Sequence, residues 1–133
     1  MQIRFHGREY TKRYHPDDIS SCRTECICAC TGLLFFLPLV SHPNSRFGRY
    51  WANQGFLVLL TELAALLVWL ILGGILGLLA AIPLIGVLFG MARALAAVAL
   101  CLALAVFIFL PMSFAARGRA KDIPFIGFMR FIK

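Results

Sequence analysis

The chain has 133 residues, of which 61% are hydrophobic and only 14% are charged, against roughly 25% charged residues in an average soluble domain. Its 13 Lys and Arg outnumber its 6 Asp and Glu, which gives a formal net charge of +7. This length and composition exclude a multidomain protein and a water-soluble globular fold, and they predict an all-α, polytopic integral membrane protein. We divide it into a basic N-terminal arm (1–16), a transmembrane helical domain (17–116) and a basic, aromatic C-terminal tail (117–133).

The arm alternates aromatic with basic residues, for example Tyr10 with Lys12. A single strand is not stable alone, so we expect the arm to lie on lipid headgroups, where basic residues attract anionic lipid. The basic clusters are short and lack a recognition motif, so no nucleic-acid binding is expected. The segment Pro16-Asp17-Asp18 predicts a helix start, because Pro suits the first turn and acidic residues suit the positive end of the helix dipole.

The first hydrophobic segment runs roughly from Ile19 to Val40. Its charge-free part, Cys26–Val40, is shorter than the ~20 residues that a membrane-crossing helix needs. We expect one helix that either crosses the bilayer, with Arg23 and Glu25 at the interface, or re-enters on the same side.

Four cysteines lie in this first segment: Cys22, Cys26, Cys28 and Cys30. Their C-x3-C-x-C-x-C spacing matches no zinc ribbon or finger. On a helix, three of them share one stripe, and we expect them to pack as small hydrophobes. Acylation, redox chemistry and soft-metal binding are the alternatives. We predict no metal, cofactor or catalytic site, because the chain also lacks a nucleophile–base set, a phosphate-binding loop and a dinucleotide fingerprint.

A polar loop is predicted over Ser41–Asn53, followed by a second helix from about Ala52 to Ala81. Asn53 stands where the polar loop meets the apolar run, so we expect it to cap this helix. Aromatic and basic side chains anchor helices at the membrane interface. Four residues of the loop are predicted to do so: Arg46, Arg49, Tyr50 and Trp51.

The run from Asn53 to Ala116 is almost wholly apolar, with Glu62 and Arg93 as its charges. Pro interrupts a helix and Gly frees the backbone, so Ile82-Pro83-Leu84-Ile85-Gly86 predicts a turn. The second and third helices should therefore form an antiparallel hairpin, the third starting between Leu84 and Arg93 and ending near Ala116.

Glu62 is the strongest candidate functional residue, because a carboxylate inside a membrane helix is costly and usually faces protein or water. It shares one side of the helix with Gln54. Arg93 should lie roughly 15 Å away along the hairpin axis, too far for an ion pair. Three roles are open: a structural hydrogen bond, an ion or proton pathway, and a contact to a partner subunit.

Two pairs of glycines have small-xxx-small spacing: Gly73 with Gly77, and Gly86 with Gly90. Such pairs let helices approach closely. We expect packing within the hairpin, with dimerisation as the alternative.

Four patches, in this order, carry a family resemblance: Phe35-Phe36-Leu37-Pro38-Leu39, Arg46-Phe47 with Ala52-Asn53-Gln54-Gly55, Ile82-Pro83-Leu84-Ile85-Gly86, and Gly118-Arg119-Ala120-Lys121-Asp122-Ile123-Pro124-Phe125-Ile126-Gly127. Over about residues 17–130 the chain resembles small uncharacterised bacterial membrane proteins related to the Tic-type subunit of the chloroplast inner-envelope import translocon. The family typically has a histidine where this chain has Trp51, and many relatives carry an N-terminal zinc ribbon that this chain lacks. The resemblance implies a helical fold in the bacterial plasma membrane and a part in assembly or transport, and it does not imply an enzyme.

We therefore predict three hydrophobic helices and a non-enzymatic scaffold or accessory subunit of a membrane assembly. The expected partners are the lipid bilayer, anionic headgroups, and either a second copy or another membrane protein. The first alternative is a minimal channel or transporter, import-like or conducting ions or protons, that uses Glu62. The second is a peripheral lipid-sensing protein that acts through its basic ends.

Overall fold

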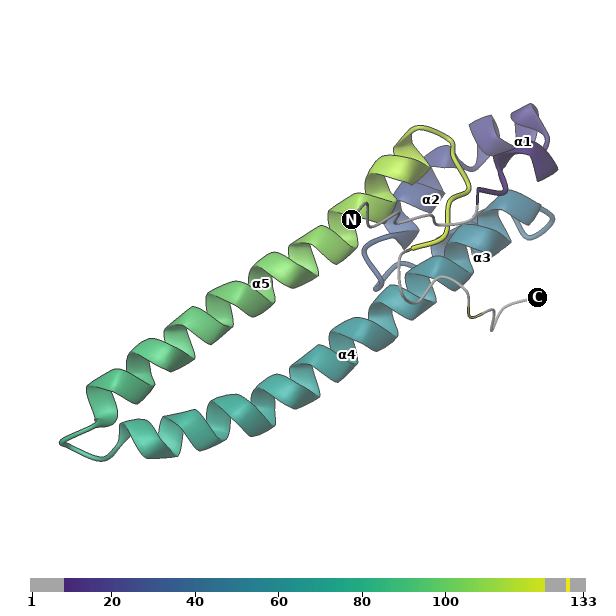
Figure 1. The fold of residues 1–133 in the computed structure, drawn as a ribbon. Coiled ribbons are helices and arrows are strands. Elements are labelled where there is room, and N and C mark those ends of the chain that lie inside the picture. The colour runs from purple at the N-terminus through teal and green to yellow at the C-terminus, as the bar shows by residue number, and fades with distance from the viewer. Residues whose placement is uncertain (1–8, 124–128, 130–133) are drawn as a thin grey trace. The chain divides into compact units, whose positions relative to one another are not determined.

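The computed structural model describes residues 9–123 and residue 129. Its helices are η1 (Thr11–Arg13), α1 (Pro16–Ser21), α2 (Arg23–Ala29), α3 (Leu37–Ser41), α4 (Arg46–Ala80) and α5 (Gly86–Ala116) (Figure 1). The described part of the chain contains no strand beyond one isolated antiparallel bridge, between Glu9 and Lys121, so the all-α prediction is confirmed. The arm before Glu9 and the tail segment 124–128 lie outside the described residues.

The chain divides into two compact units. Unit 1 comprises the residues up to Leu60 and those from Phe107 onward, and unit 2 comprises Thr61–Val106. Both α4 and α5 therefore contribute one part to each unit.

Unit 1 has a core of cysteine side chains from α2 and its two ends and aromatic side chains from α4, together with Ala115 of α5 and Ala120 of the chain that follows. Phe47 and Trp51 are fully buried, and their rings lie 6.4 Å apart in an edge-to-face arrangement. Tyr14, which lies just before α1, packs on Phe47 at 5.7 Å and on Tyr50 at 6.0 Å. The aromatic side of the first turns of α4 is thus buried in protein.

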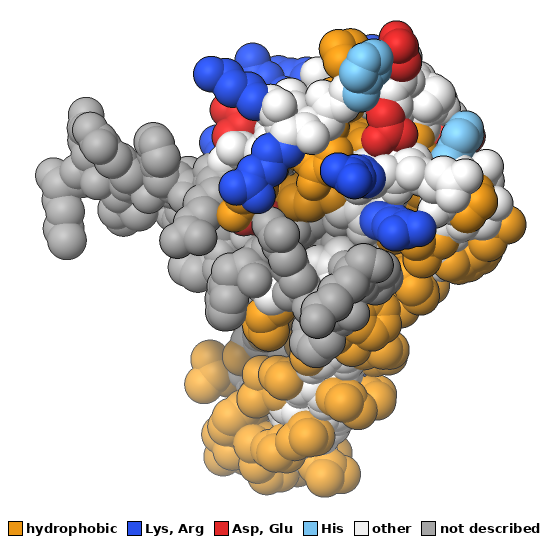
Figure 2. Space-filling model, turned by 90° about the vertical axis from the view of Figure 1, so that its right-hand side faces the viewer, with side chains coloured by type: hydrophobic (Ala, Val, Ile, Leu, Met, Phe, Trp, Pro, Cys, Tyr) orange, Lys and Arg blue, Asp and Glu red, His pale blue; other side chains and the backbone are white. Residues whose placement is uncertain are grey.

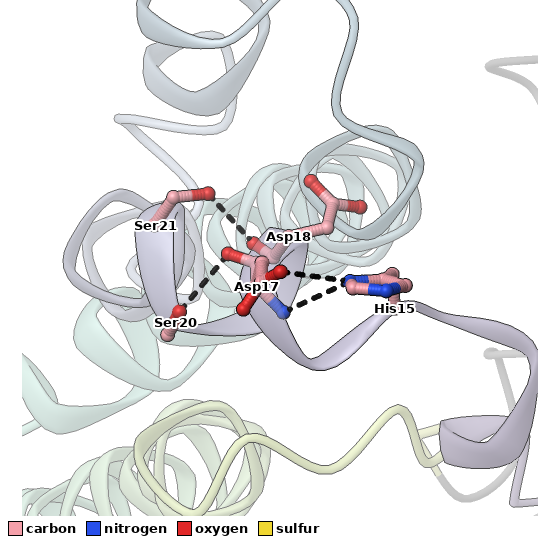
Figure 3. Close-up of polar contacts among 5 residues, drawn as sticks. All are labelled: His15, Asp17, Asp18, Ser20 and Ser21. Atoms are coloured by element: carbon pink, nitrogen blue, oxygen red, sulfur yellow. Dashed lines mark hydrogen bonds and ion pairs between the residues drawn. The ribbon is translucent and has the colours of Figure 1, made fainter.

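The predicted helix start at Pro16 is confirmed, since α1 begins there. Figure 3 shows how the turn is held: His15 Nδ1 accepts the amide N–H of Asp17 at 3.3 Å, and the hydroxyls of Ser20 and Ser21 donate to backbone carbonyls. The carboxylate of Asp18 accepts the amide N–H of Phe47 at 3.1 Å, which joins α1 to the start of α4.

The first hydrophobic segment is not a single helix. Gly32 adopts a φ of +79°, in the left-handed region that favours glycine, and the chain turns between α2 and α3. Neither short helix approaches the ~20 residues needed to cross a bilayer. The predicted count of three hydrophobic helices is therefore not confirmed.

Helix α4 begins six residues before the predicted Ala52, so the predicted loop over Ser41–Asn53 is wrong for most of its length. Ser45 stands immediately before α4, and its hydroxyl accepts the amide N–H of Gly48 at 2.9 Å. The helix continues unbroken through Asn53, which overturns the prediction that Asn53 is its cap.

Unit 2 consists of the far part of α4, the near part of α5 and the break between them. The break lies at the predicted residues, between Ala80 and Gly86, and Gly86 N–H donates to the carbonyl of Ile82 at 2.7 Å. Both α4 and α5 are long and apolar enough to cross a membrane. Large hydrophobic side chains of this unit are exposed, up to 93% for Leu84, and Figure 2 shows hydrophobic surface outside the charged region.

Candidate functional site

The candidate site in unit 1 is a buried carboxylate, Asp122, whose exposed fraction is 8%. The hydroxyl of Tyr50 donates to Asp122 Oδ1 at 2.8 Å, and Gln54 Nε2 donates to the same oxygen at 3.3 Å. The two donors lie one turn apart on α4, so both face one point. We call Tyr50, Gln54 and Asp122 the Asp122 cluster.

The chain reaches this position through a sharp end to α5. Gly118 has a φ of +67°, and its N–H donates to the carbonyl of Ala115, as is common after a helix C-terminus. The next residues pair with the arm: Tyr10 N–H donates to the Ala120 carbonyl at 2.7 Å, and Ala120 N–H donates to the Thr11 hydroxyl at 3.1 Å. This pairing holds Asp122 against α4.

Asn53 is a second polar link between α4 and the C-terminal part of the chain. Its Nδ2 donates to the carbonyl of Met129 at 2.9 Å. Asn53 and Gln54, both predicted as functional polar residues, therefore fasten the C-terminal segment to α4. The sequence did not single out Asp122, since an acidic residue in a basic tail looks like an ordinary surface charge.

The predicted interface anchors divide into two groups. Tyr50 and Trp51 are core residues in the structure rather than interfacial ones. Arg46 and Arg49 are exposed, and Arg49 Nη2 donates to the Pro43 carbonyl at 2.9 Å. The reason for the difference is that α4 starts earlier than predicted and turns its aromatic face inward.

The cysteine stripe is part of the unit 1 core, as its helical spacing predicted. Cys22, Cys26 and Cys30 are buried, and Cys26 Sγ lies 3.6 Å from Cys22 Sγ. A hydrogen bond from Cys26 holds the pKa of the Cys22 thiol below its ordinary value, and the same bond together with burial raises the pKa of Cys26. Burial raises the pKa of Cys30 to about 12. All three therefore have perturbed acidity.

Beside this stripe, three side chains of metal-ligating type converge. One ligand atom each from Cys22, Glu25 and His42 lies within 4.8 Å of the others. No metal site was predicted from the sequence, and His42 was not selected, because only the fold brings this residue close to Cys22 and Glu25. Of the described residues, this group is the one whose donors could hold a metal ion.

No protein-family model, curated protein or solved structure matches the chain. Any inference about function therefore depends on the contacts within the structure.

Glu62 and Arg93, the two charges of the apolar run, both belong to unit 2. Glu62 is half-buried, and among the described residues it makes no hydrogen bond or ion pair. The structural hydrogen bond considered for it is therefore not found in this part of the chain. Arg93 lies beside Gly77 instead, since a Cβ placed on Gly77 would come 3.1 Å from Arg93 Nη1.

Of the four predicted packing glycines, Gly86 lies against the backbone of another helix, at the end of α4. A Cβ on Gly73 would meet Trp69 of the same helix at 3.2 Å, and a Cβ on Gly90 would meet nothing within 4 Å. Gly86 lies against the Ala80 carbonyl at the helix break. Unit 1 also has close approaches: a Cβ on Gly48 would lie 2.9 Å from Cys22 Sγ, and one on Gly55 would overlap the Ala29 carbonyl.

Proposed function

We propose that this chain is a non-enzymatic scaffold or accessory subunit of a membrane assembly, in which α4 and α5 cross the bilayer as an antiparallel hairpin. The observation that carries the proposal is the exposed apolar surface of unit 2, which includes Leu67, Val68 and Leu78. Burying apolar surface is worth roughly 25 cal/mol per Å², so lipid or another apolar helix is the environment that stabilises this unit.

The chemistry of unit 1 supports a scaffold rather than an enzyme. The polar groups of the Asp122 cluster are used to join α4 to the chain after α5. Arg46 and Arg49 remain exposed beside this region, and Figure 2 shows basic, acidic and histidine side chains close together on the visible face. Such a mixed surface suits both anionic headgroups and a protein partner. The family resemblance found in the sequence points the same way.

Glu62 identifies where an intramembrane partner would bind. A charged residue inside a membrane helix is costly and usually faces protein, water or another polar group. Since none is found among the described residues, we propose that a partner subunit or a second copy supplies it. The alternative function, a channel or transporter, would instead place water against Glu62.

The first test is extraction of membranes from cells that express the full chain. Alkaline carbonate should leave the protein in the pellet, and flotation should carry it with lipid. A variant with Leu67→Lys and Val68→Lys should lose this behaviour, whereas Arg46→Gln with Arg49→Gln should keep it. Release of the unaltered chain as a monodisperse soluble protein would refute the membrane hairpin.

The second test separates scaffold from transporter. A photo-crosslinker at position 66 should capture a specific membrane protein or a second copy, and Glu62→Gln should weaken that capture. Purified chain in liposomes should not conduct protons or monovalent ions. Conduction that Glu62→Gln abolishes would replace the scaffold with the transporter.

A further inference from the structure

We propose that Cys22, Glu25 and His42 form a binding site for a borderline divalent metal ion of the Zn²⁺ type. The inference concerns unit 1 alone and does not depend on the scaffold function.

The fold brings the three side chains together from two helix ends. Cys22 caps the start of α2, Glu25 follows one turn later, and His42 caps the end of α3. Their ligand atoms all lie within 4.8 Å of one another. A closure of about 1 Å would bring them to the separations of roughly 3–4 Å that ligands at 2.0–2.3 Å from one ion have.

The three ligand side chains differ in their burial. Cys22 is fully buried, whereas the side chains of Glu25 and His42 retain 24% and 35% exposure. Solvent therefore reaches parts of the Glu25 and His42 side chains, whereas the thiol lies in the core.

Two polar atoms of the site are buried without a hydrogen bond among the described residues: Glu25 Oε2 and His42 Nδ1. His42 Nδ1 lies 4.0 Å from Glu25 Oε1, which is beyond hydrogen-bond range. Leaving such groups unpaired inside a protein is unfavourable. One cation would coordinate both of these atoms, which have no hydrogen bond within the described part of the chain.

The donor set selects the ion. Thiolate, imidazole and carboxylate are the three ligand types of zinc sites, and a thiolate disfavours Ca²⁺ and Mg²⁺. Binding exchanges the Cys22 thiol proton, which leaves to solvent, for a metal–sulfur bond. Three protein ligands leave a fourth position for water. Cys26 Sγ, 3.6 Å from Cys22 Sγ, lies at about the distance that separates two thiolates on one zinc ion.

The test is titration of the chelator-treated full chain in detergent with Co²⁺ and then with Zn²⁺. One equivalent of Co²⁺ should give a thiolate-to-metal charge-transfer band, Zn²⁺ should displace it, and the melting temperature should rise. His42→Ala and Glu25→Gln should each weaken affinity at least about tenfold, with helix content unchanged by circular dichroism.

Matched controls are His15→Ala, an exposed histidine at the start of α1, and Cys101→Ser, an exposed cysteine of α5. Both should bind as the unaltered chain does. Absence of the charge-transfer band, or binding that survives His42→Ala but is lost in Cys28→Ser, would overturn the proposed site.

Discussion

The hydroxyl of Tyr50 donates a 2.8 Å hydrogen bond to the carboxylate of Asp122, 72 positions farther along the chain. Both groups are buried, so the bond lies in the interior of unit 1. The apolar run from Asn53 to Ala116 lies between these two residues in the sequence. The bond therefore joins the part of unit 1 that precedes the run to the part that follows it.

Removing the carboxylate should destabilise unit 1. In Asp122→Ala, Tyr50 and Gln54 lose an acceptor inside the core, and each unsatisfied group costs about 1–3 kcal/mol. Thermal unfolding in detergent, followed by near-ultraviolet circular dichroism, measures the loss. The matched control is Asp17→Asn, at an exposed acid in α1. A double-mutant cycle with Tyr50→Phe should give a coupling of about 1 kcal/mol or more, and additive effects would show that the pair is not coupled.

Ser45, rather than Asn53, should behave as the cap of α4. Ser45→Ala removes the acceptor of the Gly48 N–H and should cost about 1 kcal/mol. Ser41→Ala, at an exposed serine of α3, serves as the control and should be nearly neutral. Equal melting temperatures for Ser45→Ala and the unaltered chain would argue against the cap.

Glycine substitutions should separate close contacts from open positions. Gly55→Ala places a methyl group into the Ala29 carbonyl and should destabilise unit 1 strongly, and Gly48→Ala should do so less, because Cys22 can shift. Gly74→Ala meets nothing within 4 Å and should be neutral or stabilising by up to about 1 kcal/mol, since Ala favours helix. Destabilisation by Gly74→Ala would indicate a contact that the chain alone does not make.

Stability should fall at high pH through Cys30. Burial raises its folded-state pKa from the ordinary 9.0 to about 12, so the thiol stays neutral in the folded chain while the unfolded chain ionises. The stabilisation is complete below pH 9.0 and is lost progressively as pH rises toward about 12. Cys30→Ala should flatten part of this decline in denaturant unfolding from pH 8 to 11, and Cys101→Ala should not. A parallel slope in both variants would refute the assignment.

Glu62 should not be needed for folding of the isolated chain. Glu62→Gln should leave the free energy of unfolding in detergent within about 0.5 kcal/mol of the unaltered value, because no contact among the described residues is lost. Glu62→Leu should be neutral or stabilising in detergent and yet lose the crosslinked partner. A large loss of stability in Glu62→Leu would restore the structural hydrogen bond as its role.

Helical class, the break near Pro83 and the start of α1 at Pro16 all follow from local chemistry, and the structure agrees with each. The start of α4 does not, because Phe47 and Trp51 resemble interfacial aromatics until the packing of α2 around them is known. The same reason hides Asp122 and His42. Each acquires its surroundings through contacts between distant segments, and hydrophobic periodicity carries no information about those.

The pairing of Ala120 with Tyr10 and Thr11 bears on the order of events during synthesis. The Tyr50–Asp122 bond cannot form until α5 has left the ribosome. Until then, the part of unit 1 that precedes the apolar run lacks the C-terminal residues that it contacts. Contacts of such long sequence separation form slowly. In the proposed hairpin, both apolar helices would already be in the lipid when these long-range contacts form. In that order of events, insertion of the hairpin would precede folding of unit 1.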